Sequence, residues 1–527
     1  MSKVLILDFG SQFTQLITRR IRELNVYSEI HPFTYPIEKI KADSQIGAII
    51  FSGGPNSIYE AGSPDVDPEI FELGIPVLGI CYGLQLMGSK LGGTVEGSNK
   101  REYGRTELSI PVANKLFDFE NSVSHFNVWM SHGDHLTQLP DGFEVIGSTD
   151  NCPIAAIANT AKNFYGIQFH PEVAHTQNGS HIISNFLFKI AGLEPDWTSK
   201  SFIEHEVEKI QMQVGSDKVL CGLSGGVDSA VTAVLIHKAI GDQLHCMFVD
   251  HGLLRTGERE QVEKLFRDSF KINLTVVDAS KIFLDRLNGV TEPEQKRKII
   301  GNTFIEIFET ESKKIGEFKF LAQGTLYPDV VESISFNGGP SHTIKSHHNV
   351  GGLPEKMNFK LVEPLRELFK DEVRKVGRGL GMPEQMINRH PFPGPGLAIR
   401  IISDVTNEKL ETLRQADQIF IEELKNTFPD KVEGKWVTEK SLYDQTWQAF
   451  CVLTPVQSVG VMGDGRTYEN LLGIRAVTAT DGMTADWAHL PYEFLAQVSN
   501  RIINEVKGVN RVVYDISSKP PATIEWE

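Results

Sequence analysis

Cysteine and long apolar runs are scarce in this chain of 527 residues. The five cysteines are widely spaced and form no C-x-x-C pair, which argues against a disulfide framework and favours a reducing compartment. No stretch reaches the roughly 18 consecutive apolar residues that suggest a membrane span. The opening MSKVLILDFG contains a short apolar run that Asp8 interrupts, unlike a signal peptide. We therefore expect a cytoplasmic protein with no membrane partner.

Positive charge is also in deficit. Lys and Arg number 52 against 68 Asp and Glu, which gives a formal net charge of −16. A general duplex-binding surface depends on Lys and Arg that displace counterions from the phosphate backbone. We therefore expect no nucleic-acid partner, and an anionic ligand must be held by local groups. With 40% hydrophobic and 23% charged residues, the composition is that of a globular enzyme with several cores.

Short apolar segments alternate with helical patterns along most of the chain. KVLILDFG, GAIIFSGG and IPVLGI predict strands of one α/β domain over residues 1–192, with a linker near 192–200. KVLCGLS and LHCMFVD predict the parallel strands of a second α/β domain over residues 196–395. The prolines of HPFPGPG exclude a regular helix there, and residues 396–527 mix strand-like and helical patterns, which predicts a smaller α+β domain.

A candidate nucleophile lies at the end of the apolar strand in IPVLGICYGLQLMG. Cys81 stands between this strand and a predicted helix, on a sharp turn that pushes its side chain outward. Backbone N–H groups and the helix N-terminus favour a thiolate at such a position. The alternative is a buried cysteine that only fills a small hole. Residues elsewhere in the chain decide between the two.

Two other segments offer the groups that a cysteine nucleophile needs. His170 and Glu172 are two apart on a strand-like run, so both side chains should emerge on one face, where the carboxylate can orient the imidazole. Gly53 follows another strand, and its neighbourhood lets a backbone amide approach a ligand closely, as an oxyanion hole requires. Each segment alone also fits an ordinary turn.

Together the three segments resemble the class I glutamine amidotransferases. Their G-x-C-x-G-x-Q elbow is matched by GICYGLQ around Cys81, and their H-P-E pair by His170 and Glu172. The resemblance implies that Cys81 attacks the side-chain amide of glutamine, that His170 moves the proton and that Glu172 orients His170. It also implies that the backbone N–H groups of Gly53 and Tyr82 bind the oxyanion.

A second candidate site lies in LCGLSGGVDSAV. No segment of the chain has the Walker A pattern with its lysine. Instead, SGGVDS follows an apolar strand and opens a predicted helix, so backbone amides, the Ser229 hydroxyl and the helix N-terminus can form an anion cradle. Asp228 adds a hard oxygen ligand suited to Mg²⁺. The alternative is a glycine-rich connection without a ligand.

This loop resembles that of the N-type ATP pyrophosphatases, which hold the β,γ-pyrophosphate as a leaving group and transfer AMP. The resemblance implies a doubly wound, adenine-nucleotide α-hydrolase-like domain that binds ATP with Mg²⁺ at Asp228. In IKSHHNVGGLP we expect a mobile lid whose Lys345 reaches phosphate, with an ordinary basic surface loop as the alternative. The expected ATP and pyrophosphate contacts are Ser224, Gly225, Gly226, Val227, Asp228, Ser229, Val249, Gly324 and Lys345.

The chain as a whole, from its first strand to the final KPPATIEWE, resembles the glutamine-hydrolysing GMP synthase family. The resemblance implies that ammonia from glutamine replaces an adenylated oxygen of xanthosine 5′-monophosphate (XMP), which gives GMP, AMP and pyrophosphate. It also implies a homodimer formed through the C-terminal domain. The expected XMP contacts are Arg255, Arg400, Arg511, Lys519 and Glu525. Two alternatives stay open: a glutamine-dependent, AMP-forming synthetase with another acceptor, and a nucleotide-binding protein that has lost the chemistry.

Overall fold

The computed structural model describes residues 2–120, 123–333, 359–428, 431–432, 435–436, 440–462, 465–479 and 484–527. It has two compact units, and the chain passes from the first to the second between Phe202 and Ile203. All five cysteines are buried and free. Among the described residues, no helix is both long enough and apolar enough to cross a membrane.

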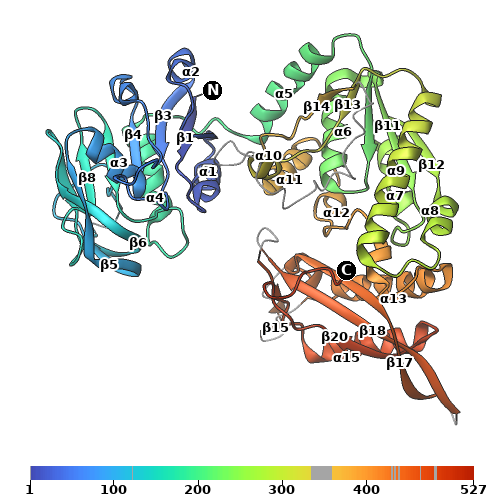
Figure 1. The fold of residues 1–527 in the computed structure, drawn as a ribbon. Coiled ribbons are helices and arrows are strands. Elements are labelled where there is room, and N and C mark those ends of the chain that lie inside the picture. The colour runs from blue at the N-terminus through green and yellow to red at the C-terminus, as the bar shows by residue number, and fades with distance from the viewer. Residues whose placement is uncertain are drawn as a thin grey trace. The chain divides into compact units, whose positions relative to one another are not determined.

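The first unit is built on a seven-stranded sheet with the order β2-β1-β3-β4-β9-β8-β7 (Figure 1). The first five strands run parallel, and β8 and β7 are antiparallel additions at one edge. Central strands such as KVLILD are buried along most of their length because apolar side chains pack on both faces. The strands are β1 (Lys3–Asp8), β2 (Tyr27–Pro32), β3 (Ile46–Phe51), β4 (Val77–Ile80), β7 (Glu144–Gly147), β8 (Ala156–Asn159) and β9 (Phe164–Ile167).

A long antiparallel ribbon and short helices complete this unit. The ribbon pairs β5 (Thr94–Ser109) with β6 (His125–Gln138). The helices are α1 (Thr14–Glu23), α2 (Ile37–Ala42), η1 (Pro68–Glu72), α3 (Tyr82–Lys90), α4 (Gly179–Ser184) and η2 (Asn185–Ile190). Figure 1 places α3 directly beside β4, the strand that precedes it in the chain. This strand-to-helix step carries the candidate nucleophile.

The second unit begins with a five-stranded, all-parallel sheet, which confirms the predicted doubly wound domain. Its order is β12-β11-β10-β13-β14, so β10, which is central, precedes the candidate phosphate loop. Its strands are β10 (Val219–Leu223), β11 (Leu244–Asp250), β12 (Asn273–Asp278), β13 (Phe320–Ala322) and β14 (Lys360–Val362). Its helices are α5 (Ser199–Val214), α6 (Val227–Ile240), η3 (Gly241–Gln243), α7 (Glu258–Glu263), η4 (Lys264–Ser269), α8 (Ser280–Leu287), α9 (Pro293–Ile315), α10 (Tyr327–Ser333), α11 (Lys370–Gly379) and α12 (Glu384–Ile387).

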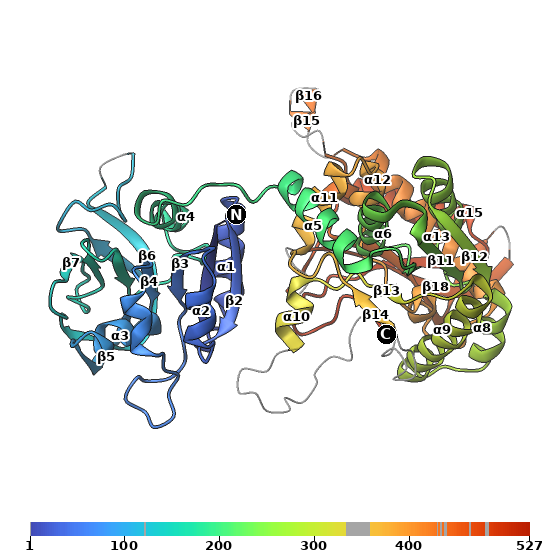
Figure 2. The same ribbon diagram turned by 90° about the horizontal axis from the view of Figure 1, so that it is seen from above.

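The C-terminal part of this unit is α+β, as predicted. Its main sheet is formed by β17, β18, β19 and β20, with β20 parallel to β18. The strands are β15 (Lys431–Val432), β16 (Lys435–Trp436), β17 (Gln448–Met462), β18 (Gly465–Thr478), β19 (Asp486–Trp487) and β20 (Val509–Tyr514). The helices are η5 (Gly396–Arg400), α13 (Asn407–Asn426), α14 (Leu442–Gln445) and α15 (Tyr492–Glu505). Figure 2 shows the same elements from above.

One hydrophobic core extends from the parallel sheet of the second unit into its C-terminal part. It includes Leu220 of β10, Phe308 of α9, Leu413 of α13 and Leu453 of β17. The expected boundary at residues 395 and 396 therefore lies within a shared core, next to η5, which contacts both α9 and β17. Because the two parts share buried apolar surface, side chains from both can meet in a fixed geometry.

Candidate active site

Cys81 occupies a sharp turn between β4 and α3. Its φ of 51° lies in the left-handed region, which is uncommon for a residue other than glycine. Strain of this kind is tolerated where the surrounding structure fixes the backbone. Here the Cys81 N–H donates to the carbonyl oxygen of Ile167, and the Gly83 N–H donates to that of Ser52. The predicted nucleophile elbow is present in the structure.

The glycines on either side of Cys81 have a steric reason. A Cβ on Gly79 would lie 2.6 Å from the Gly83 carbonyl carbon, and a Cβ on Gly83 would lie 2.5 Å from the Phe51 carbonyl oxygen. Both contacts are with backbone atoms, which cannot move aside as a flexible side chain can. Glycine at both positions of G-x-C-x-G therefore allows α3 to begin directly after β4, in close contact with neighbouring backbone atoms.

His170 and Glu172 form a buried pair beside Cys81. The His170 Nδ1 lies 2.7 Å from Glu172 Oε1, and the Glu172 side chain is fully buried. Burial lowers the pKa of His170, but the Glu172 charge and the hydrogen bond with Cys81 outweigh it and raise that pKa to about 10. His170 is thus an imidazolium near neutral pH, positioned to give a proton to a leaving amine.

The sequence pattern predicted that His170 and Glu172 lie on a strand, and this prediction was wrong. β9 ends at Ile167, and both residues lie on the turn that follows. That turn is fixed by the Thr176 hydroxyl, which donates to the His170 carbonyl oxygen over 2.6 Å, and by the His170 N–H, which donates to the Trp129 carbonyl oxygen. Tertiary hydrogen bonds, rather than strand periodicity, bring the two side chains together.

Gly53 and Tyr82, the residues expected to form the oxyanion hole, both lie beside Cys81. A Cβ on Gly53 would be 3.1 Å from His170 Cε1 and 3.7 Å from the Cys81 Cβ, so the Gly53 backbone borders both groups. Tyr82 is the first residue of α3, and its N–H therefore has no acceptor within the helix. The structure brings all five sequence-predicted residues of the glutaminase site together.

The loop between β10 and α6 is closed by its own hydroxyl groups. The Ser224 N–H donates to Ser229 Oγ at 3.2 Å, and the Gly226 N–H donates to Ser224 Oγ at 3.3 Å. Gly225 has a φ of 76°, which a residue with a side chain rarely adopts. The Ser224 and Gly226 amides of the expected anion cradle therefore contact serine oxygens, and these hydroxyl groups can rotate to contact a ligand as well.

Asp228, in the first turn of α6, has an unsatisfied carboxylate oxygen. Its Oδ1 is buried and has no hydrogen-bond partner among the described residues, whereas its Oδ2 lies 3.4 Å from Lys370 Nζ. An orphaned buried carboxylate oxygen at a helix N-terminus suits a hard cation that also contacts phosphate. Gly324, after β13, packs against this helix start, since a Cβ on it would lie 3.2 Å from the Asp228 carbonyl carbon.

The other expected ATP contacts are less informative. Val227 is the first residue of α6, and Val249 is a buried residue near the end of β11, the strand next to β10. Lys345 and the rest of its predicted lid lie outside the described residues.

Two residues that sequence reasoning missed fix the phosphate loop. Arg389 Nη1 donates to the Gly225 carbonyl oxygen at 2.8 Å, while its Nη2 pairs with the fully buried carboxylate of Glu258. The second Glu258 oxygen accepts from the Arg255 N–H at 3.0 Å. Glu258 thus links the phosphate loop to Arg255. No local pattern marks it, because its partners are distant in sequence.

Three of the five expected XMP contacts cluster around Phe392. Arg400 is fully buried and makes a bidentate ion pair with Glu525, at 3.0 and 2.8 Å. Arg255 pairs with Asp417 at 3.0 Å. The guanidinium carbons of Arg255 and Arg400 lie 5.0 and 5.2 Å from the centroid of the Phe392 ring.

The remaining two lie on other segments of the C-terminal region. Arg511 is on β20, where its Nε donates to Ser458 Oγ at 3.2 Å. Lys519 pairs with Ala485 through backbone hydrogen bonds. The described structure therefore gathers Arg255, Arg400 and Glu525, and it gives Arg511 and Lys519 separate surroundings.

Comparisons with known proteins agree with this arrangement. The models for glutamine amidotransferase class-I, NAD synthase and the GMP synthase C-terminal domain match residues 5–190, 198–302 and 435–526. The fold and sites thus define an enzyme that combines a glutamine amidotransferase with an ATP pyrophosphatase. A protein named GMP synthase [glutamine-hydrolyzing] from Bradyrhizobium diazoefficiens is 60% identical to this chain, and one of the same name from Chlorobaculum tepidum is 58% identical. Both matches cover 100% of this chain, and they cover 93% and 99% of the relatives' own lengths. The chain belongs to the glutamine-hydrolysing GMP synthase family.

Proposed function

We propose that the protein converts XMP to GMP with ATP and glutamine. Glutamine and water give glutamate and ammonia in the first unit. In the second unit, the O2 oxygen of XMP attacks the α-phosphorus of ATP, pyrophosphate leaves, and ammonia then displaces AMP from C2. Adenylation is needed because a purine oxygen is otherwise a poor leaving group. One observation carries this proposal: a single chain holds both a cysteine–histidine–glutamate site and an SGGVDS loop at a helix start.

In the glutaminase step, each residue has a distinct task. Cys81 attacks the amide carbon of glutamine, the N–H groups of Gly53 and Tyr82 stabilise the oxyanion, and the His170 imidazolium protonates the departing ammonia. Neutral His170 then takes a proton from water as that water attacks the thioester. Glu172 keeps the imidazole in one orientation and stabilises its positive charge.

In the synthetase step, the loop between β10 and α6 receives the pyrophosphate. The positive end of the α6 dipole and the adjacent N–H groups favour an anion there. The buried Asp228 Oδ1 would hold Mg²⁺. When bound, Mg²⁺ neutralises charge on the leaving pyrophosphate. Arg255, Arg400, Arg511, Lys519 and Glu525 remain the proposed contacts for XMP, and two of them, Arg400 and Glu525, form an ion pair with each other.

Product analysis tests this function directly. The protein is incubated with XMP, ATP, Mg²⁺ and glutamine, and we expect GMP, AMP, pyrophosphate and glutamate in equal amounts. Release of ADP in place of AMP would contradict the adenylation step. If glutamine is hydrolysed and AMP appears only with an acceptor other than XMP, the alternative of a synthetase with another acceptor holds.

Loss of the Asp228 carboxylate tests the metal-binding part of the proposal. Asp228→Ala is expected to stop synthesis from both glutamine and added ammonium, because both routes need adenylated XMP. Glutamine hydrolysis, measured as glutamate release, should continue. Normal pyrophosphate release by this variant would remove Asp228 from the site.

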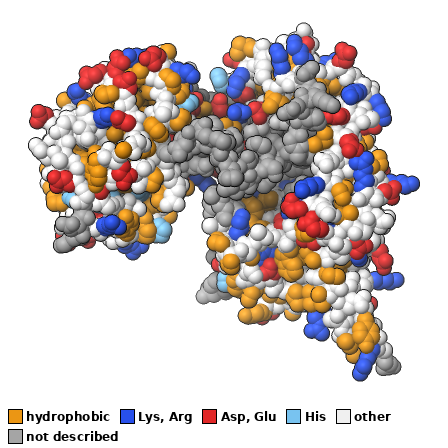
Figure 3. Space-filling model, in the orientation of Figure 1, with side chains coloured by type: hydrophobic (Ala, Val, Ile, Leu, Met, Phe, Trp, Pro, Cys, Tyr) orange, Lys and Arg blue, Asp and Glu red, His pale blue; other side chains and the backbone are white. Residues whose placement is uncertain are grey.

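We also propose a homodimer formed through the C-terminal region, and a cytoplasmic location. Large hydrophobic side chains are exposed on the β17–β18–β20 sheet: Val456, Val459, Val461, Tyr468 and Val513. Figure 3 shows hydrophobic side chains over this C-terminal part of the second unit. Apolar surface of this kind is typical of a protein–protein interface. Five free, buried cysteines fit a reducing compartment.

A further inference from the structure

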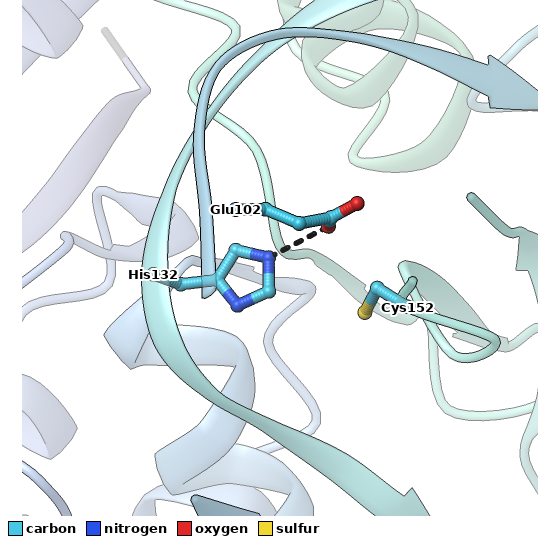
Figure 4. A group of neighbouring side chains, drawn as sticks. All are labelled: Glu102, His132 and Cys152. Carbon is cyan, nitrogen blue, oxygen red and sulfur yellow. Dashed lines mark hydrogen bonds and ion pairs between the residues drawn. The ribbon is translucent and has the colours of Figure 1, made fainter. Parts of the chain in front are cut away.

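A buried group of three potential metal ligands lies in the first unit and shares no residue with the Cys81 triad. Glu102 on β5 and His132 on β6 are register partners across the ribbon, and Cys152 comes from the loop between β7 and β8 (Figure 4). Their exposed fractions are 4%, 5% and 0%. One ligand atom from each residue lies within 4.8 Å of the other two.

The hydrogen bonds of His132 place its Nε2 atom and a Glu102 carboxylate oxygen face to face. The Nδ1 atom lies 3.0 Å from the Asp134 carbonyl oxygen, which only accepts, so Nδ1 carries a proton. In a neutral ring, Nε2 then presents its lone pair to the Glu102 carboxylate oxygen, 3.0 Å away. A proton shared by the two atoms fills the position between them at 3.0 Å. A Zn²⁺ ion can replace that proton once the two atoms separate to about 3.3 Å.

The outer partners of the three side chains match a metal site. The Thr149 hydroxyl donates to the second Glu102 oxygen at 2.9 Å and accepts from the Cys152 N–H at 3.0 Å. The bond from His132 Nδ1 to a backbone carbonyl fixes the tautomer that offers Nε2 as a ligand. Hydrogen bonds on the side away from the group therefore orient Glu102 and His132, and Thr149 holds the Cys152 backbone.

The donor set selects the kind of cation. Imidazole nitrogen, carboxylate oxygen and cysteine sulfur together suit Zn²⁺, whereas Mg²⁺ and Ca²⁺ prefer oxygen alone. Zinc bonds of about 2.0–2.3 Å place ligand atoms about 3.3–3.6 Å apart in a tetrahedron. The sulfur can close the remaining gap by side-chain rotation, since its present contact is a weak one with the Ile154 carbonyl oxygen at 3.4 Å.

We propose that Glu102, His132 and Cys152 bind one Zn²⁺ ion, with a fourth position open to water. The ion would tie the β5–β6 ribbon to the loop that carries Cys152. This inference does not depend on the acceptor used in the synthetase step.

Cobalt substitution tests the site in the full chain. Because Cys81 and His170 form a second cysteine–histidine pair, the titration uses the Cys81→Ala variant. We expect one equivalent of Co²⁺, displaced by Zn²⁺, with a near-ultraviolet thiolate-to-cobalt charge-transfer band. Adding Cys152→Ser should remove this band, and either Cys152→Ser or Glu102→Gln should weaken Zn²⁺ binding by more than about 100-fold.

Cys451→Ser is the matched control, because it removes another buried thiol outside the group and should leave the cobalt band unchanged. Absence of a thiolate band in Cys81→Ala would overturn the proposal even if the Cys152 variant failed to fold. Unchanged zinc affinity in a folded Cys81→Ala/Cys152→Ser protein would do the same. Either result would leave an imidazolium–carboxylate pair as the role of Glu102 and His132.

Discussion

At the scale of single residues, the glutaminase site depends on positions that admit few substitutions. Cys81 holds a left-handed backbone, and the neighbouring glycines allow close backbone contacts. Cys81→Ala should abolish glutamine-dependent GMP synthesis and leave ammonium-dependent synthesis within about twofold, because only the first half-reaction needs the sulfur. Assays with glutamine and with ammonium chloride, run on the same preparation, check this. Glutamine-dependent turnover by the variant would refute the assignment of the nucleophile.

The His170–Glu172 pair makes stability depend on pH in a defined direction. The folded pKa of His170 is about 10, above the roughly 6.5 of an unfolded histidine. Its contribution to stability is therefore fully present below about pH 6.5 and is lost as the pH rises towards 10. The difference in unfolding free energy between the wild type and His170→Asn should shrink over this range. Urea unfolding at pH 6, 8 and 10 measures it, and a difference that grows with pH would contradict the ion pair.

At the scale of elements, α7 and the loop before α6 are coupled through Glu258. Its carboxylate holds Arg389, which in turn holds the Gly225 carbonyl oxygen. Removing one partner of a buried ion pair costs about 3–5 kcal/mol. Glu258→Gln should therefore lower the melting temperature and raise the KM for ATP by about tenfold or more, since the loop loses its fixed conformation.

Glu263, on the same helix, provides the control for this prediction. It pairs with Arg259 and Arg267 on the surface, where ion pairs contribute about 0–1 kcal/mol. Glu263→Gln should leave the KM for ATP almost unchanged in ammonium-dependent assays. Equal effects of Glu258→Gln and Glu263→Gln on the KM for ATP would show that Glu258 does not fix the conformation of the loop.

At the scale of the whole molecule, the exposed apolar face of the C-terminal sheet is the surface through which we propose that the protein dimerises. Val459→Asp combined with Tyr468→Asp should convert the dimer to a monomer, because a charge in an apolar interface is strongly unfavourable. Sedimentation velocity measures the change from the proposed dimer to a monomer. Val112→Asp, at an exposed position of the first unit, should not alter the molecular mass. A wild-type protein that sediments as a monomer at micromolar concentration would contradict the proposal.

Much of the fold and part of the site could be predicted from the sequence. Alternating apolar and helical segments identified both parallel sheets, because buried parallel strands need continuous apolar runs. The sequence pattern predicts a strand where His170 and Glu172 lie on a turn, because periodicity does not register the hydrogen bonds that shape this turn. In these bonds the Thr176 hydroxyl donates to the His170 carbonyl oxygen, and the His170 N–H donates to the Trp129 carbonyl oxygen.

The sequence by itself determined the elbow around Cys81 and the SGGVDS loop, because both depend on steric and backbone requirements among near neighbours. Only the tertiary structure decided the pairing of Arg389 with Glu258, of Arg400 with Glu525, and the meeting of Glu102, His132 and Cys152. The first two pairs are separated by 131 and 125 residues. Such contacts form where the packing of distant segments excludes water, because a charge that is buried there needs a partner of opposite charge. No local sequence pattern encodes which distant residue that partner is.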